Sequence, residues 1–221
     1  MSKMIKPVDL LQLRVSLQKV SPLIWRRLLV RSDSTIADLH HTLQIVMDWE
    51  DLHLYHFLIR GRRYGIGRIG AFGFREDAHQ VRLERFGFSL REKFIYVYDY
   101  YDQWQLEIRV EARVPLDPQR RYPACVAGQR AAPPEECGGP WQFLALKQRY
   151  SLWAIGERLL EILEDENLAQ NRVDYRDEVR TYLYWLNSEQ FDRRAVDQRL
   201  QTFFHKGEKG QDHENSDQAC C

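Results

Sequence analysis

Two aspartates, Asp99 and Asp102, stand three residues apart just before Trp104, between two segments that have the pattern of strands. Carboxylates at this spacing could hold a divalent cation or act as an acid and base pair. The simpler alternative is that each carboxylate bonds its own backbone, as aspartate commonly does in a hairpin turn. This turn role is favoured, because it explains the spacing without a ligand.

A second set of reactive side chains lies in the proline-rich segment 115–140. The set consists of Cys125, Glu135, Glu136 and Cys137. Together with His53, the two cysteines could form a zinc site as thiolates. Structural zinc sites usually contain closely spaced cysteine pairs, and this sequence has none. Two small buried thiols that hold a loop in place are therefore favoured. No cofactor is predicted, and a divalent metal is the one candidate that these residues leave open.

Two pairs of histidines offer further ligand-type nitrogen atoms. His53 and His56 lie three residues apart on a segment with strand character, so their side chains are expected on opposite faces of the sheet. His40 and His41 are adjacent on a predicted helix and are also expected to point apart. A lone histidine is more often a hydrogen-bonded structural group than a ligand, so neither pair is expected to form a shared site.

The arginines of residues 60–91 form the most distinctive charge pattern in the chain. Eight arginines and no lysine stand against three acidic residues, with five tyrosines and phenylalanines interleaved. Guanidinium groups bind phosphate and aromatic rings stack on bases, so this segment could contact nucleic acid or an acidic protein partner. The first candidates are Arg60, Arg62, Arg63 and Arg68. The alternative is a solvated face over a core of aromatics, and the pI near 7.1 is low for a dedicated nucleic-acid binder.

Arg26 and Arg27 follow Trp25 in a second apolar run. In a strand the two side chains face opposite sides of the sheet. An ion pair with an acidic residue is favoured over anion binding for one of them, and the other is expected in solvent.

The scaffold for these residues follows from the hydrophobic pattern. Alternating apolar residues predict strands, and Thr35 with Asp38 forms an acidic capping box at the start of a helical stripe over residues 35–48. A turn is expected at 61–65, a short helix near 83–88, a long loop over 115–140 and helices after Pro140. The predicted strands lie near 10–18, 23–30, 53–60, 93–99 and 104–114.

Strands first and helices last predict an α+β fold: a largely antiparallel sheet, one helix packed after the first hairpin, and a helical C-terminal part. Residues 1–204 are expected to form one domain, of which 141–204 is the helical part. Residues 205–221 are polar and are expected to be a disordered tail. The glycines of 61–73 match no phosphate-binding loop, which disfavours nucleotide-binding α/β folds.

Composition excludes several classes of protein. The 221 residues are 44% hydrophobic, enough for a core, and no stretch approaches the roughly 18 apolar residues of a membrane span. The first ten residues contain no apolar signal core and the four cysteines do not make a disulfide scaffold, so a reducing cytoplasm and no membrane contact are expected. Residues 1–98 carry 16 basic and 10 acidic side chains, whereas residues 99–221 carry 16 and 22. The net charge of zero therefore hides a basic first half.

Four segments in order resemble the plasmid pRiA4b Orf-three-like family, from about residue 9 to about residue 204. They are Pro22–Arg27, Trp49–Phe57, Tyr96–Trp104 and Tyr122–Gly139. The variant Gly138–Trp141 is similar to members carried as passengers in insertion sequences, often labelled TnpR-like. Among the histidines, His53 matches the motif. Two tyrosines stand between Asp99 and Asp102 where the family usually has Phe-Gly, and Gln105 replaces a common histidine, which weakens a catalytic role for this turn.

Three classes of function follow from these observations. The favoured hypothesis is an accessory module of mobile-element origin that binds nucleic acid or an acidic protein partner through residues 60–91. The alternative is a metal-dependent, hydrolase-like enzyme. Its candidate polar cleft consists of His53, Asp99, Asp102, Trp104, Cys125, Glu135, Glu136 and Cys137. A third class is a protein-interaction domain that docks through its acidic C-terminal helices. The sequence leaves open whether the protein is an enzyme and what its oligomeric state is.

Overall fold

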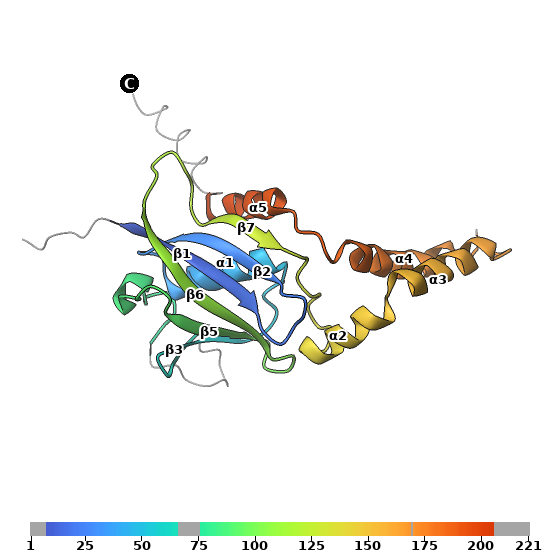
Figure 1. Ribbon diagram of the computed structural model, residues 1–221, viewed down its shortest axis with the longest axis horizontal. Helices are drawn as coiled ribbons and strands as arrows, with labels where there is room; N and C mark the ends of the chain where they lie inside the picture. Colours follow the sequence, from blue (N-terminus) through green and yellow to red (C-terminus); the bar gives the residue numbers. More distant parts are fainter. Residues whose placement is uncertain (1–7, 66–75, 169, 206–221) are drawn as a thin grey trace, which may run out of the picture.

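One seven-stranded sheet dominates the computed structural model, which describes residues 8–65, 76–168 and 170–205 (Figure 1). The strand order is β4-β3-β5-β6-β1-β2-β7, and every pairing in it is antiparallel. The strands are β1 (Asp9–Leu17), β2 (Trp25–Arg31), β3 (Tyr55–Ile59), β4 (Arg62–Tyr64), β5 (Lys93–Tyr98), β6 (Trp104–Pro115) and β7 (Ala124–Gln129).

Helix α1 (Ile36–Met47) packs on one face of this sheet. The predicted capping box is present, since Thr35 Oγ1 accepts from the backbone of Asp38 and the Asp38 carboxylate accepts from the backbone of Thr35. Leu39 and Leu43 are completely buried, in a core shared with the inward residues of β1 such as Leu13. The helical stripe of the sequence therefore becomes the face of α1 that closes the core.

The C-terminal part consists of α2 (Gly139–Arg149), α3 (Leu152–Glu164), α4 (Arg172–Asn187) and α5 (Arg193–His205). Helices α2 to α4 lead away from the sheet, and α5 returns to pack against β7 and α1 (Figure 1). Helices α3 and α4 pack on each other through residues such as Ile155 and Ile162. We call this projecting pair the helical arm.

The base of the helical arm is held by charged and aromatic contacts. The Glu189 carboxylate pairs with Lys147 of α2 at 2.6 Å and with Arg130, just after β7, at the same distance. The rings of Tyr150 and Trp185 stack with centroids 5.5 Å apart. The chain thus leaves for the arm and comes back from it at one place.

The α+β fold with a largely antiparallel sheet is confirmed, and the predicted strands and helix 35–48 occur within about two residues of their predicted ends. The short helix is a 3₁₀ turn at Leu83–Phe86. Two predictions were wrong. The expected turn at 61–65 contains β4, and the expected loop 115–140 contains β7. Both strands are short and gain their order from pairing, β4 with β3 and β7 with β2.

No helix within the described ranges is both long enough and apolar enough to cross a membrane.

Candidate functional site

Three of the motif segments meet where helix α2 begins. Tyr98 Oη accepts the backbone N–H of Leu52 at 3.0 Å and donates to the Glu135 carboxylate. The other oxygen of that carboxylate accepts the backbone N–H of Glu50 at 2.5 Å. Trp49 Nε1 donates to the carbonyl oxygen of Pro133 at 3.1 Å. We call this meeting point of loop 48–54, turn 99–103 and segment 133–139 the junction.

Asp102 belongs to the same junction. Its Oδ2 accepts the backbone N–H of Gly138 at 3.1 Å. Gly139 has a φ of +75°, and a Cβ at this position would clash with the carbonyl oxygen of Asp102. A residue with a side chain fits neither this backbone conformation nor this close approach. Asp102 therefore fixes the start of α2 on the sheet.

His53 lies before β3 rather than on it, beside two carboxylates of the junction. Its Nε2 is 3.3 Å from Glu136 Oε1 and 3.9 Å from Asp99 Oδ2. The His53 side chain is 31% exposed, and that of Glu136 is 66% exposed. Asp99 Oδ1 accepts the backbone N–H of Tyr101 at 2.8 Å, as predicted for an aspartate in a turn. An imidazole beside carboxylates could transfer a proton. The Asp99 carboxylate also has a structural role, because it accepts the hydrogen bond from the backbone of its own turn.

The two cysteines of the predicted cleft lie in different places. Cys137 is at the junction, where burial and then the Asp102 carboxylate raise the pKa of its thiol to about 12. Cys125 lies in β7, and its backbone N–H donates to Asp197 of α5 at 2.8 Å. Burial raises the pKa of the Cys125 thiol to about 11. Both thiols are therefore poor nucleophiles near neutral pH, since the thiolate is the reactive form.

The structure thus brings together at the junction His53, Asp99, Asp102, Glu135, Glu136 and Cys137. Cys125 contacts α5 instead. Trp104 is completely buried, with ring centroids 6.1 Å from Trp49 and 6.4 Å from Phe143, and it is a core residue beneath the junction.

Two of the six arginines that the structure describes in the basic segment pair with acidic groups nearby. Arg60 forms an ion pair with Glu92 at 2.8 Å, and Arg85 pairs with Glu76. Arg62 and Arg63 are exposed on the edge strand β4. Arg68 lies outside the described residues. Part of the basic charge of residues 60–91 is therefore neutralised locally.

Arg26 and Arg27 differ more than a strand pattern predicts. Arg27 forms the expected ion pair, with Glu111 at 2.6 Å. Arg26 is only 1% exposed, and its guanidinium donates to the carbonyl oxygens of Val46 and Gln129 at 2.9 and 3.0 Å. Burial lowers the pKa of Arg26 to about 10, so it is still charged at neutral pH. The expectation that the second arginine lies in solvent was wrong, because carbonyl groups and the ring of Phe191 surround the Arg26 guanidinium instead.

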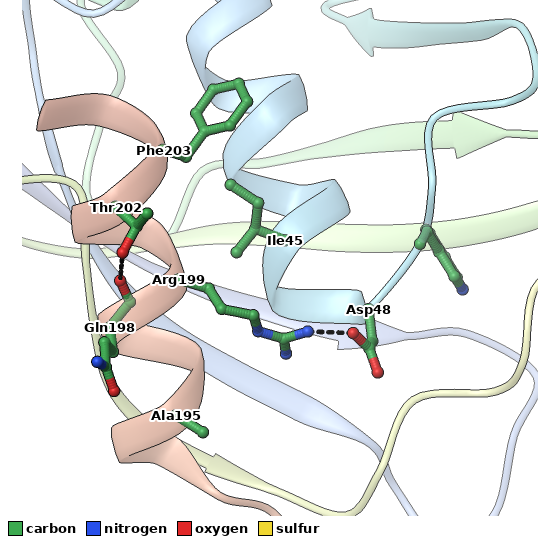
Figure 2. A pocket seen from close by; sticks show the side chains of 8 residues that line it. Ile45, Asp48, Ala195, Gln198, Arg199, Thr202 and Phe203 are labelled. Atoms are coloured by element: carbon green, nitrogen blue, oxygen red, sulfur yellow. Dashed lines mark hydrogen bonds and ion pairs between the residues drawn. The ribbon is translucent and has the colours of Figure 1, made fainter. Parts of the chain in front are cut away.

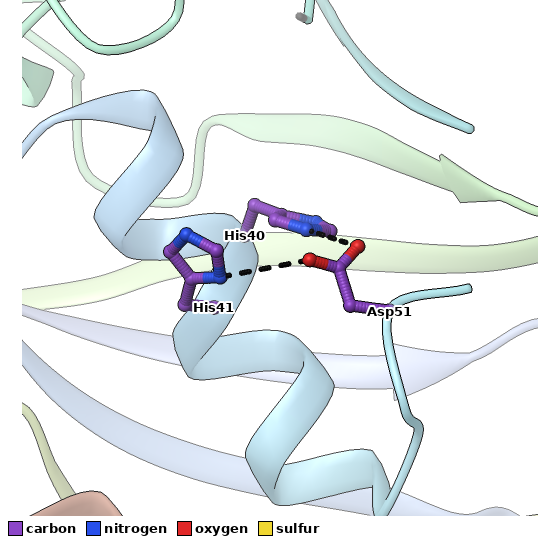
Figure 3. Close-up of side chains that lie close together, drawn as sticks. All are labelled: His40, His41 and Asp51. Atoms are coloured by element: carbon purple, nitrogen blue, oxygen red, sulfur yellow. Dashed lines mark hydrogen bonds and ion pairs between the residues drawn. The ribbon is translucent and has the colours of Figure 1, made fainter. Parts of the chain in front are cut away.

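A third cluster, which the sequence did not reveal, lies on α1. His40 Nε2 is 2.9 Å from Asp51 Oδ1, and His41 Nδ1 is 3.9 Å from Asp51 Oδ2 (Figure 3). The prediction that these histidines point apart was wrong, because it left out the loop after α1: the ring centroids are 5.0 Å apart and both rings face Asp51. Asp48 and Asp51 both have positive φ, so this loop folds back along the helix and brings one carboxylate to both rings.

A groove of about 840 Å³ runs between α1 and α5 (Figure 2). Ile45 and Phe203 give it an apolar wall, and the ion pair of Asp48 with Arg199 spans its other part. The ring of Phe203 is 5.4 Å from that of His41. The groove and the His40–His41–Asp51 cluster are therefore neighbours.

Comparisons with known proteins agree with this architecture. The family model described as plasmid pRiA4b ORF-3-like protein matches residues 9–200. The uncharacterized protein y4hQ of Sinorhizobium fredii is 30% identical over 136 residues, which are 61% of this chain and 70% of that protein. The crystal structure of a protein of unknown function, MM3350 from Methanosarcina mazei Go1, matches with a TM-score of 0.62 and 30% identity, over 86% of this chain and 99% of that one. This chain belongs to the plasmid pRiA4b ORF-3-like protein family.

Proposed function

We propose that the protein is a partner-binding accessory module whose helical arm docks onto a second copy of the chain. One observation carries the proposal: the arm exposes an unusual number of large apolar side chains. Trp153 is 83% exposed and Val173 is 77% exposed. Exposed apolar surface of this extent commonly marks an interaction site. The other exposed members on the arm are Leu152, Leu160, Leu163, Leu183 and Leu186.

The apolar residues of α3 form two stripes. Ile155 and Ile162 are buried against α4. Trp153, Leu160 and Leu163 recur at helical spacing on another side of the same helix and remain exposed. A two-helix hairpin with a second apolar stripe has the surface of half a four-helix bundle. The arm of a second copy would bury the apolar side chains that the first arm leaves exposed.

The charges of the arm fit a second copy. A groove of about 620 Å³ on the arm is lined mostly by apolar side chains, with Arg176 and Arg180 at its rim. The exposed acidic residues of α3 are Glu157, Glu161 and Glu164. A two-fold interface brings each patch of one copy onto the matching patch of the other. The arginines of one α4 could therefore face the glutamates of the other α3.

The test is the oligomeric state over a concentration series, measured by light scattering or analytical ultracentrifugation. We expect a monomer–dimer equilibrium that Leu183→Glu and Leu160→Glu shift strongly toward monomer. Leu90→Glu is the matched control, because Leu90 is 62% exposed but lies on the sheet side of the molecule. A chain that stays monomeric at every concentration contradicts the proposal, and unchanged circular dichroism confirms that each variant is folded.

Contact with nucleic acid is a second candidate function, supported by Arg62 and Arg63. Both are exposed, and neither has an ion-pair partner among the residues that the structure describes. We expect weak binding that falls with salt, because phosphate contacts release counterions. Arg62→Ala with Arg63→Ala should reduce it, whereas Arg60→Ala should have a smaller effect because Arg60 is held by Glu92. Unaltered binding by the double variant excludes this surface.

The metal-dependent hydrolase has less support from the geometry. Cys125 lies away from the junction, and the Glu135 and Asp102 carboxylates already bond backbone groups there.

Two further proposals concern the location of the protein in the cell and the origin of its gene. A cytoplasmic location is supported by the free thiols of Cys125 and Cys137. An origin in mobile elements is supported by the family name, which refers to a plasmid, and by the variant Gly138–Trp141. The genes that neighbour close relatives would test that origin.

A further inference from the structure

We propose that His40, His41 and Asp51 bind a divalent transition-metal ion such as Zn²⁺. Two imidazole nitrogens and a carboxylate are a donor set that first-row transition metals favour. The inference is independent of the helical arm, because the cluster lies on α1 and on the loop that follows it (Figure 3).

The donor atoms already have distances close to those of a metal site. One atom from each of the three side chains lies within 4.8 Å of the other two. The Asp51 carboxylate lies 2.9 Å from His40 Nε2 through Oδ1 and 3.9 Å from His41 Nδ1 through Oδ2. Metal–ligand bonds of about 2.0–2.1 Å in a tetrahedron separate neighbouring donors by about 3.3 Å. The two contacts involve different oxygens of the carboxylate and lie on either side of that value, so Asp51 is already placed near both nitrogens.

His40 is held in the orientation that a ligand needs. Its Nδ1 is 2.8 Å from Tyr96 Oη, and its ring stacks on Tyr55 with centroids 3.5 Å apart. Metal ligation through Nε2 places the ring proton on Nδ1, where Tyr96 Oη can accept it. Gln44 Nε2 also contacts Tyr96 Oη, at 2.8 Å, and fixes its position. The ligating nitrogen of His40 thus has a rigid, buried support.

Asp51 is held in place by its backbone. Its φ of +59° is left-handed, a conformation that aspartate tolerates better than most residues. Its N–H donates to Gln44 Oε1 at 3.1 Å, which ties the loop to α1. Gln44 therefore supports both Asp51 and, through Tyr96, His40. One side chain fixes two of the three proposed ligands.

Solvent reaches the cluster from the side of His41 and Asp51. His40 is completely buried, whereas His41 and Asp51 are 31% and 34% exposed. Three protein ligands with an open side are typical of zinc sites that also bind water or a small molecule, unlike closed structural sites. His41 packs on Phe203, which lines the groove between α1 and α5. A ligand in that groove would lie beside the metal.

The experiment is a competition titration of Zn²⁺ between the full-length protein, stripped with a chelator, and a chromophoric zinc chelator. All samples carry Cys220→Ser and Cys221→Ser, because adjacent thiols at the C-terminus could bind zinc by themselves. We expect one equivalent of Zn²⁺ per chain, and an affinity that His41→Ala or Asp51→Asn lowers by about 10-fold or more. His79→Ala is the matched control, since His79 is exposed and outside the cluster, and should bind like the parent.

Two further measurements separate the proposal from its alternatives. Zn²⁺ should raise the thermal midpoint of the parent but not that of His41→Ala, because an ion that binds the native state stabilises it. Co²⁺ bound in place of Zn²⁺ should lack the strong charge-transfer band that thiolate ligands produce. Binding that is unchanged in His41→Ala and Asp51→Asn, or a thiolate band, would overturn the site. Light scattering on the same samples shows independently whether the arm forms a dimer.

Discussion

In the sheet, Leu13 and Leu28 are completely buried in the core shared with α1, whereas in the helical arm Leu152 and Trp153 are 70% and 83% exposed. Both regions have apolar residues at regular spacing. The sheet has partners within the chain for all of its inward residues, because seven strands and α1 close around them. The arm is only two helices thick and has one inner face. The same kind of residue therefore stabilises the fold in one region and stays exposed in the other, where we propose that it forms a surface for association.

The largest expected effect tests this contrast directly. Leu43→Ala removes a completely buried side chain from α1. It should lower the free energy of unfolding by about 2–5 kcal/mol, because the surrounding residues cannot fill the cavity. Leu163→Ala removes a side chain that is 70% exposed on the arm and should change stability by less than about 0.5 kcal/mol. Urea unfolding of dilute, monomeric protein measures both. Equal losses would mean that the arm is packed like the core.

A glycine from each region should respond to alanine with opposite sign. Gly139→Ala should destabilise by about 2 kcal/mol, because the new Cβ meets the carbonyl oxygen of Asp102 in a left-handed backbone conformation. Gly156→Ala in α3 should stabilise by about 0.5–1 kcal/mol, because a Cβ there meets nothing within 4 Å and alanine favours helix. Thermal unfolding of the two variants measures the pair. Loss of stability in both would show that the outer side of α3 is covered.

The N-terminal caps of α1 and α3 should differ in how much stability each contributes, by less than the two glycines do. Thr35→Ala removes a capping box whose carboxylate bond is 2.8 Å long, and should cost about 1 kcal/mol. Ser151→Ala removes a single bond of 3.3 Å to the N–H of Ala154 and should cost about half as much. Hydrogen exchange at the first turn of each helix reports the effect locally. A greater loss of protection at α3 would contradict this order.

The smallest expected effect is a dependence on pH in the sheet. The hydrogen bond and charge of Arg27 hold the pKa of Glu111 below its usual value. The pair therefore stabilises the fold above the unfolded-state pKa of about 4.3, and this contribution disappears as the pH falls through the lower folded-state pKa. Glu111→Gln should cost less than about 1 kcal/mol at pH 7 and nothing near pH 2. A loss that is the same at both pH values would assign the effect to packing rather than charge.

The elements that the sequence predicts well are those whose pattern is local. Helix 35–48 carries its cap and its apolar stripe within 14 residues, and the long strands β1 and β6 alternate clearly. Strand β7 could not be found in this way, because Ala124–Gln129 contains few residues that favour strands. Its order comes from pairing with β2, about 100 residues earlier, and from Asp197 of α5. No local pattern contains those contacts.

The candidate site was predictable only as a set of residues. The motif residues around Asp102 and Glu135 do meet, but their bonds to the backbone of other segments depend on where the loops run. The sequence could not place Arg26 in the core, because the carbonyl groups that accept its hydrogen bonds belong to residues distant in the chain. His40 and His41 were judged by the helix alone. The loop that brings Asp51 to both of them contains two left-handed aspartates, Asp48 and Asp51 itself, and sequence spacing does not encode this backbone feature.

The contacts of Glu189 with Lys147 and Arg130 have a consequence for how such a protein can change over evolutionary time. Because the chain leaves the sheet and returns to it at one place, the segment between Tyr150 and Trp185 is an insertion that projects from the sheet. Its length and surface can vary without altering any strand pairing, since loop closure costs little more for a long excursion than for a short one. The His40–His41–Asp51 cluster and the arm can thus diversify separately. A descendant could change the exposed surface of its arm and keep the residues of that cluster unchanged.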